Sequence, residues 1–112
     1  MSKSLNIRDL RMDYQRLSRQ LTAIKWICQG SVIKRSYQRP TGKNLKKYGP
    51  YYSWTRKVNN KTVTVALSLA QHRAMQSALA NHRRMNVILD QMRRLSEKAI
   101  FATTRGVAKR NR

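Results

Sequence analysis

The residues best suited to chemistry lie in a basic and aromatic segment between residues 34 and 61. Nine lysines and arginines fall within these 28 residues, and neither aspartate nor glutamate occurs there. Tyrosine and tryptophan are interleaved with the cations, so phosphate contacts would lie beside planar rings, on which bases stack at about 1–3 kcal/mol each. The pattern predicts a nucleic-acid-binding surface; the alternative is a basic hairpin tip that is only solvated. The expected cationic contacts here are Lys34, Arg35, Arg39, Lys43, Lys46, Lys47, Arg56, Lys57 and Lys61.

The aromatic residues of this segment are expected to divide between stacking and packing. Tyr52 and Trp54 fall on the apolar side of a predicted strand, where packing is the better interpretation. Tyr37 and Tyr51 lie outside that apolar set and are the expected stacking residues.

A second source of cations is a pair of double arginines, Arg83-Arg84 and Arg93-Arg94, ten residues apart on a predicted helix. Two acidic residues stand three or four positions from the second pair, which favours intrahelical ion pairs there. We therefore expect Arg83 and Arg84 to contact phosphate more than Arg93 and Arg94 do.

The C-terminal stretch 103–112 carries basic groups and no acid. Such a segment is typical of an arm that becomes ordered on an anion. Its expected contacts are Arg105, Lys109 and Arg110.

The charge of the whole chain also favours a nucleic-acid partner. It has 25 Lys and Arg against 4 Asp and Glu, a formal net charge of +21. Ordinary small domains carry a net charge with a magnitude of roughly 2–8. Between Asp13 and Asp90 there is no carboxylate, yet this span holds fifteen Lys and Arg. Self-repulsion of this size is relieved by a polyanion, and released counterions make that binding salt-dependent.

Catalysis is not expected. Four scattered acids cannot readily supply the carboxylate clusters of metal-dependent hydrolases, and no phosphate-binding glycine loop or zinc-protease motif occurs. His72 and His82 lie ten residues apart on a predicted helix, or about 15 Å, too far to share a metal ion. With Cys28 as the single cysteine, neither a disulfide framework nor a Cys-x-x-Cys zinc site is available. We expect no enzyme, no metal and no cofactor.

No stretch approaches the roughly 20 apolar residues of a membrane span, and the N-terminus lacks a signal-peptide core. A lone thiol suits a reducing compartment. The sequence therefore predicts a cytoplasmic protein without a membrane partner.

Two amphipathic helices are expected to position these residues. Over residues 5–28, a 3-4 spacing of apolar residues forms a heptad seam, and Gly30 is placed to end the helix. A second helix should begin near Ser68, which forms a capping box with Gln71, and run to about Phe101. The first seam comprises Ile7, Leu10, Tyr14, Leu17, Leu21, Ile24 and Cys28, and the second Met75, Ala78, His82, Met85, Leu89, Met92 and Ala99, with Ser96 as its weak point.

Strands are expected between the helices. Segments 51–58 and 61–67 flank Asn59-Asn60, which suits a two-residue hairpin turn because asparagine tolerates positive φ. That register places Tyr52, Trp54, Val63, Val65 and Leu67 on a core-forming face, and Tyr51, Ser53, Thr55, Lys57, Thr62 and Thr64 on a polar face. Residues 31–38 should add a third strand, and 39–49 a basic, turn-rich loop.

The predicted fold class is α+β: a long N-terminal helix, a small antiparallel sheet of two or three strands, and a long C-terminal helix, with the helices packed as an antiparallel coiled pair. We expect a single domain over residues 1–102, followed by the basic arm 103–112. Helix length left unmatched in this pair could serve self-association.

Four pieces of the chain carry a family resemblance: G-S-V-I-K-R at 30–35, Y-G-P-Y-Y-S-W-T-R-K-V at 48–58, K-T-V-T-V-A-L-S at 61–68 and N-x-R-R at 81–84. With them the chain resembles a poorly characterised family of short prokaryotic proteins, a domain of unknown function often found near mobile-element genes. Many members carry cysteines before G-P-Y-Y, which implies a small metal knuckle. The corresponding loop here has none, so the resemblance implies no metal for this chain.

These observations predict a non-catalytic protein that binds nucleic acid, with structured RNA slightly favoured over DNA because no helix-turn-helix or other base-reading module occurs. It would serve as an accessory subunit of a larger ribonucleoprotein or mobile-element complex. The alternative is a coiled-coil oligomerisation or adaptor module that binds a protein partner, which the heptads and five methionines favour.

Overall fold

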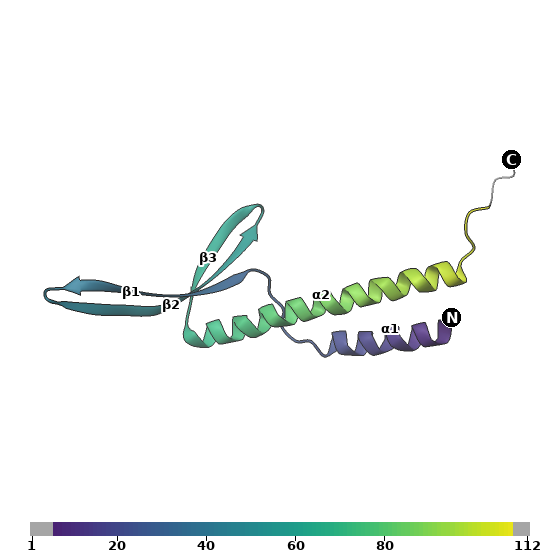
Figure 1. Ribbon diagram of the computed structural model, residues 1–112, viewed down its shortest axis with the longest axis horizontal. Helices are drawn as coiled ribbons and strands as arrows, with labels where there is room; N and C mark the ends of the chain where they lie inside the picture. The colour runs from purple at the N-terminus through teal and green to yellow at the C-terminus, as the bar shows by residue number, and fades with distance from the viewer. Residues whose placement is uncertain (1–5, 109–112) are drawn as a thin grey trace. The chain divides into compact units, whose positions relative to one another are not determined.

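The computed structural model describes residues 6–108 and contains two helices and three strands (Figure 1). The predicted α+β fold class is confirmed, with one helix before and one helix after a three-stranded antiparallel sheet in the chain. In chain order the elements are α1 (Ile7–Thr22), β1 (Ser31–Thr41), β2 (Asn44–Val58), β3 (Lys61–Leu67) and α2 (Leu69–Thr103).

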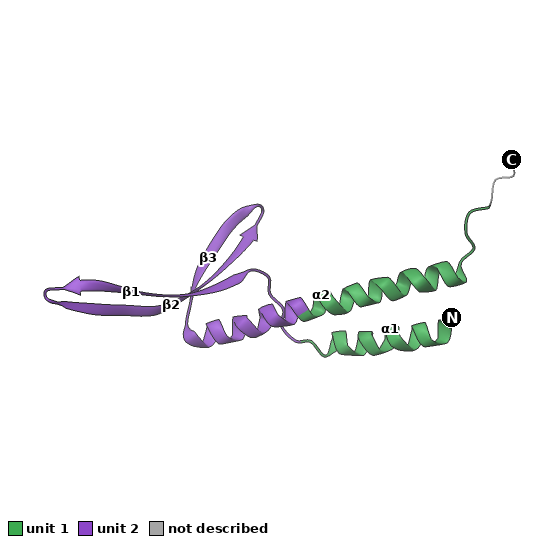
Figure 2. Cartoon of the chain, in the orientation of Figure 1, with its two compact units in different colours: residues 1–24, 84–112 green, residues 25–83 purple. Residues whose placement is uncertain are grey.

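The chain divides into two compact units (Figure 2). One comprises residues 1–24 and 84–112, hence α1 and the C-terminal part of α2. The other comprises residues 25–83, hence the sheet and the N-terminal part of α2. Helix α2 therefore contributes to both units.

In the first unit, α1 runs antiparallel to the C-terminal part of α2 (Figure 1). Leu10 and Leu17 from α1 and Ile88 from α2 are buried, which confirms the expected antiparallel helical pair. Asn6 caps the start of α1, because its side-chain oxygen accepts a hydrogen bond from the backbone N–H of Arg8 at 3.0 Å. Within residues 6–108, neither helix combines the length and apolar character needed to cross a membrane.

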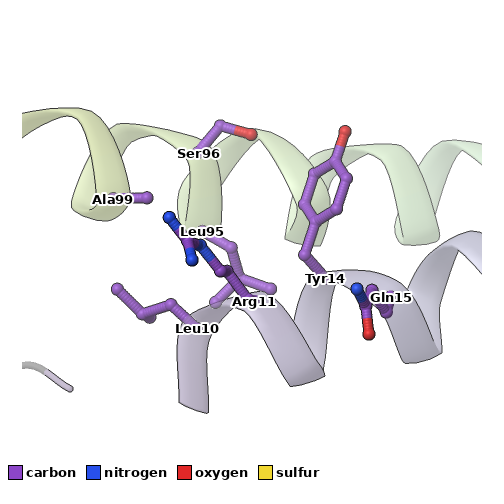
Figure 3. A pocket seen from close by; sticks show the side chains of 7 residues that line it. All are labelled: Leu10, Arg11, Tyr14, Gln15, Leu95, Ser96 and Ala99. Carbon is purple, nitrogen blue, oxygen red and sulfur yellow. The ribbon is translucent and has the colours of Figure 1, made fainter. Parts of the chain in front are cut away.

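A pocket of about 180 Å³ lies between these two helices at Ser96 (Figure 3). The hydroxyl of Ser96 donates to the carbonyl of Met92 at 2.8 Å, within its own helix. Ser96 therefore interrupts the apolar seam, as expected, and the pocket opens to solvent beside Leu10 and Leu95. The pocket is an open groove along the helix pair, and its other lining residues are Arg11, Tyr14, Gln15 and Ala99.

The first helix ends earlier than its seam predicts, at Thr22 rather than near Cys28. In the second unit, the backbone N–H of Cys28 donates to the carbonyl of Ala78 at 3.2 Å. The carbonyl of Trp26 accepts a hydrogen bond from the Asn81 side chain at 3.0 Å. Segment 25–29 thus bonds to α2 instead of continuing its own helix, a tertiary effect that local periodicity does not reveal. Gly30 is consequently not the helix terminator that was predicted.

The start of α2 matches its prediction. Ser68 and Gln71 form the reciprocal capping box: the Ser68 backbone N–H donates to the Gln71 side chain at 2.9 Å, and the Gln71 backbone N–H donates to the Ser68 hydroxyl at 3.1 Å. The helix then continues to Thr103, two residues beyond the predicted Phe101.

The sheet has the strand order β1-β2-β3. The β2–β3 register pairs Val58 with Lys61 and Tyr52 with Leu67, as predicted. Asn59 and Asn60 have φ angles of 50° and 65°, so both turn residues adopt the left-handed conformation that a tight hairpin requires.

The predicted loop 39–49 is instead a second hairpin, and that prediction was wrong. Thr41 pairs with Asn44 across a two-residue turn, and the ladder extends from there back towards Ser31. Gly42 supplies positive φ, at 62°. Pro40 indicates a loop in sequence, but β1 is an edge strand, where the missing N–H of proline can face solvent.

The expected core-forming face of the sheet is only half-buried. No residue of β1, β2 or β3 is buried, and Val65 is 41% exposed. Tyr52 packs on His72 of α2, with 4.4 Å between ring centroids. Burial in this unit is concentrated on α2 at His72, Ala78 and Leu79, because one helix covers too little of a three-stranded sheet.

Candidate nucleic-acid interface

A β-bulge in β2 determines the composition of one sheet face. Tyr37 pairs with Tyr48 and Arg35 pairs with Tyr51, so Gly49 and Pro50 together oppose the single residue Ser36. Because side chains alternate along a strand, Tyr48 and Tyr51, three residues apart, would otherwise point to opposite faces. The extra residue at the bulge places them on the same face.

Three tyrosines therefore form a row on this face. Tyr37 lies between the other two: its ring centroid is 5.5 Å from that of Tyr48 and 5.7 Å from that of Tyr51. The interplanar angles are 18° and 23°, which is stacked geometry. Tyr37 is 43% exposed and Tyr51 is 50% exposed, so the row is open to solvent. We call the sheet face that carries this row the tyrosine face.

Cations lie over two rings of the row, those of Tyr37 and Tyr48. Arg39 and Lys46 are cross-strand partners. The Arg39 guanidinium lies 5.2 Å from the centroid of the Tyr37 ring and 6.0 Å from that of Tyr48, and the Lys46 ammonium lies 5.4 Å from that of Tyr48. These distances are typical of cation–π contacts. Both side chains remain exposed, so each keeps N–H groups for an anionic ligand.

The Tyr51 hydroxyl at the other end has a raised pKa. A hydrogen bond with the Tyr37 side chain raises the pKa of Tyr51 above its usual value, and desolvation adds to the increase.

The register separates the predicted cationic contacts between the two faces. Side chains point to the two faces of the sheet in turn along each strand, and paired residues share a face. The tyrosine face therefore carries Arg35, Arg39, Lys46 and Lys57, together with the predicted stacking residues Tyr37 and Tyr51. It places Lys34, Lys47, Arg56 and Lys61 on the opposite face. Lys43 lies in the turn between β1 and β2. Strand alternation thus assigns six of the predicted residues to one face of the sheet, with Lys57 at its β2–β3 end.

Arg56 has a different environment from the other cations. Its guanidinium lies 4.0 Å from the centroid of the Trp54 ring. In the described part of the chain, its Nη1 atom is buried without a hydrogen-bond partner. The Trp54 indole N–H donates to the carbonyl of Gln29 at 2.9 Å. Arg56 is therefore a packed residue as much as a surface cation.

The remaining predicted contacts lie outside the sheet, in α2 and in the C-terminal stretch 103–112. Arg83 belongs to the same unit as the sheet, whereas Arg84 and Arg105 belong to the other unit. All three are exposed. Lys109 and Arg110 lie outside the described residues.

Among the described residues, both ion pairs lie within a helix. Arg94 lies 3.0 Å from Asp90, and Arg16 lies 3.6 Å from Asp13. The sheet segment 31–67 contains no carboxylate, and among the described residues neither ion pair involves one of its cations. Within residues 6–108, no three potential metal-ligating acids, histidines or cysteines lie close enough together to hold an ion.

Tyr48 is the residue that the sequence-based site lacked. It was grouped with the aromatic residues of the segment but not assigned a binding role. The available signal was Gly49-Pro50, because glycine and proline inside a strand indicate a bulge. A bulge at that point reverses the face of Tyr48 relative to Tyr51.

The fold and this surface together define a helix–sheet–helix protein with a basic, aromatic sheet face. No protein-family model matches the chain, and neither a curated protein nor a solved structure matches it.

Proposed function

We propose that the protein binds nucleic acid through the tyrosine face and catalyses no reaction on it. The observation that carries the proposal is the row of Tyr48, Tyr37 and Tyr51 flanked by Arg39 and Lys46 on a sheet without acids. Phosphates are bound by cations and bases by aromatic rings, and sheet surfaces with both are a recurrent means of binding single strands.

The electrostatics support a polyanionic ligand. With a net charge of +21 and carboxylates confined to positions 9, 13, 90 and 97, the sheet gains from each phosphate without breaking an ion pair. Counterion release then adds a favourable, salt-dependent free energy.

Within this proposal, structured RNA is favoured over DNA, and the protein acts as an accessory subunit of a ribonucleoprotein or mobile-element complex. The exposed sheet supports such a role, since none of its residues is buried within the chain and a large partner would cover it. The single cysteine, Cys28, suits a reducing cytoplasm.

A second candidate function is an adaptor that binds protein through its helices. The observation in its favour is exposed apolar surface on α2: Phe101 is 84% exposed, Val87 59% and Ile100 56%. Measuring the molecular size in high salt, with nucleic acid removed, separates the two functions. A stable oligomer under those conditions favours the adaptor, and its absence favours the nucleic-acid binder.

The proposed function is tested by two double variants with equal loss of charge on opposite faces of the sheet. Arg39→Gln with Lys46→Gln removes two cations from the tyrosine face, and Lys34→Gln with Lys47→Gln removes two from the other face. Fluorescence anisotropy with a labelled RNA should show the larger loss of affinity for the first variant. Equal losses would mean that charge alone, and not the tyrosine face, directs binding.

A further inference from the structure

The two ends of the tyrosine row differ, and the difference indicates what the row can accept. At the Tyr48 end, Lys46 and Arg39 lie over the rings. Among the described residues, no cation lies over the Tyr51 ring at the other end, and Tyr51 is half-exposed. A further planar group can therefore extend the stack only at Tyr51.

The surroundings of Tyr51 suit a nucleotide. Arg35 is its cross-strand partner and is exposed, which places a guanidinium within reach of a phosphate next to a stacked base. Ser53 follows on the same face of β2 and offers a hydroxyl that can donate to or accept from a base edge.

Only an unpaired base fits this arrangement. In a duplex, both faces of each internal base are already stacked on neighbours, so an aromatic side chain on a surface cannot reach them. A base in a loop, bulge or single strand exposes its face and can stack on tyrosine.

We propose that Tyr51 is the stacking site for an unpaired nucleobase of the bound strand, with Arg35 contacting the adjacent phosphate. This inference rests on the proposed function and specifies its ligand: single-stranded segments rather than uninterrupted duplex. Tyr37 acts as a positioning residue, because its ring stacks on that of Tyr51.

The test compares two ligands of equal charge, a short oligodeoxyadenylate and an abasic strand with the same number of phosphates. The parent protein should bind the strand with bases about tenfold more tightly, which corresponds to ~1.4 kcal/mol and lies within the range for one stacked base. Tyr51→Leu should abolish this preference and leave the affinity for the abasic strand unchanged. Tyr51→Phe should retain the preference, because the ring remains.

Trp26→Leu is the matched aromatic control. Trp26 is 86% exposed and lies outside the sheet, so its removal should leave the preference intact. Loss of the preference in this variant and its survival in Tyr51→Leu would move the stacking site away from the tyrosine face and overturn the inference. Where leucine lowers the melting temperature, Tyr51→Thr, which keeps a good strand former, provides the same comparison.

The outcomes separate this inference from the proposed function. If the parent protein binds neither these strands nor the labelled RNA of the preceding test, the proposed function is wrong; if it binds the RNA but neither strand, base stacking at Tyr51 is wrong. If it binds both strands equally, or if Tyr51→Leu weakens both by the same factor, nucleic-acid binding stands and base stacking at Tyr51 is wrong.

Discussion

The backbone of Gly49 has a φ of 103°, in a region that residues with a side chain rarely adopt. A Cβ atom added there would lie 2.8 Å from the Arg35 carbonyl oxygen and 3.1 Å from the Ser36 Cα. Glycine is therefore required at the bulge for two reasons, conformation and space. The position of Tyr48 relative to Tyr51 depends on that bulge.

Gly49→Ala should destabilise the sheet by about 1–3 kcal/mol, the usual cost of a strained backbone position. It should also weaken nucleic-acid binding, because the tyrosine row would lose its register. Chemical denaturation followed by circular dichroism measures the first effect and anisotropy the second. Gly106→Ala is the control, since its Cβ would meet nothing within 4 Å and its φ is not positive; equal effects of the two substitutions would contradict the role given to the bulge.

At the scale of elements, the basic tip of the β1–β2 hairpin should contribute more to nucleic-acid binding than the double arginine Arg93-Arg94 of α2. Neutralising Lys43, Lys46 and Lys47 to Gln removes exposed cations that have no acidic partner in the sheet. We expect weakened binding chiefly through Lys46 and Lys43, since Lys47 lies on the face opposite the tyrosine row, a salt slope lower by about two contacts, and an unchanged melting temperature.

The comparison variant is Arg93→Gln with Arg94→Gln. It breaks the ion pair between Arg94 and Asp90, both of which are largely exposed, so it should cost only about 0.3–0.5 kcal/mol of helix stability. This arginine variant should lose less affinity for nucleic acid than the variant that lacks the three lysines. A larger loss than that of the lysine variant, measured by the same salt titrations, would place the binding surface along α2.

The helical pair is tested by Leu17→Asp. Leu17 is 5% exposed, and loss of a buried leucine alone costs roughly 2–5 kcal/mol; an unpaired buried carboxylate adds to this. The thermal transition of the first unit should shift strongly or disappear in circular dichroism. Met12→Asp is the control on the same helix, because Met12 is 59% exposed; similar melting of the two variants would mean that the helices do not pack through this seam.

The elements differ in how far the sequence predicts them. The Asn59-Asn60 hairpin and the Ser68 capping box depend on local chemistry, and both were predicted with their partners. The end of α1 was not, because the hydrogen bond from Cys28 to Ala78 joins residues fifty positions apart. The β1–β2 hairpin was missed for a related reason: Pro40 breaks most strands but is tolerated at a sheet edge.

The candidate site shows the same division. Its composition, cations and tyrosines without acids, is evident in the sequence. Its geometry depends on a one-residue shift at Gly49, which reverses the face of Tyr48. Alternation alone would have split the tyrosine row between two faces.

At the scale of the whole molecule, both the small number of buried residues and the large positive charge favour binding to a polyanion. Of the described residues, only Leu10, Leu17, His72, Ala78, Leu79 and Ile88 are buried, while the chain carries a net charge of +21. A chain with so few buried residues and so much unbalanced charge is expected to be stabilised by a bound polyanion, which would relieve its self-repulsion.

The measurement that tests the central claim most directly is the salt dependence of binding to a single-stranded RNA. The account predicts that log K falls linearly and steeply with log salt, with a slope of about −0.7 for each phosphate contact and several contacts in total. A flat dependence between low and physiological salt, or no binding at low salt, would contradict it.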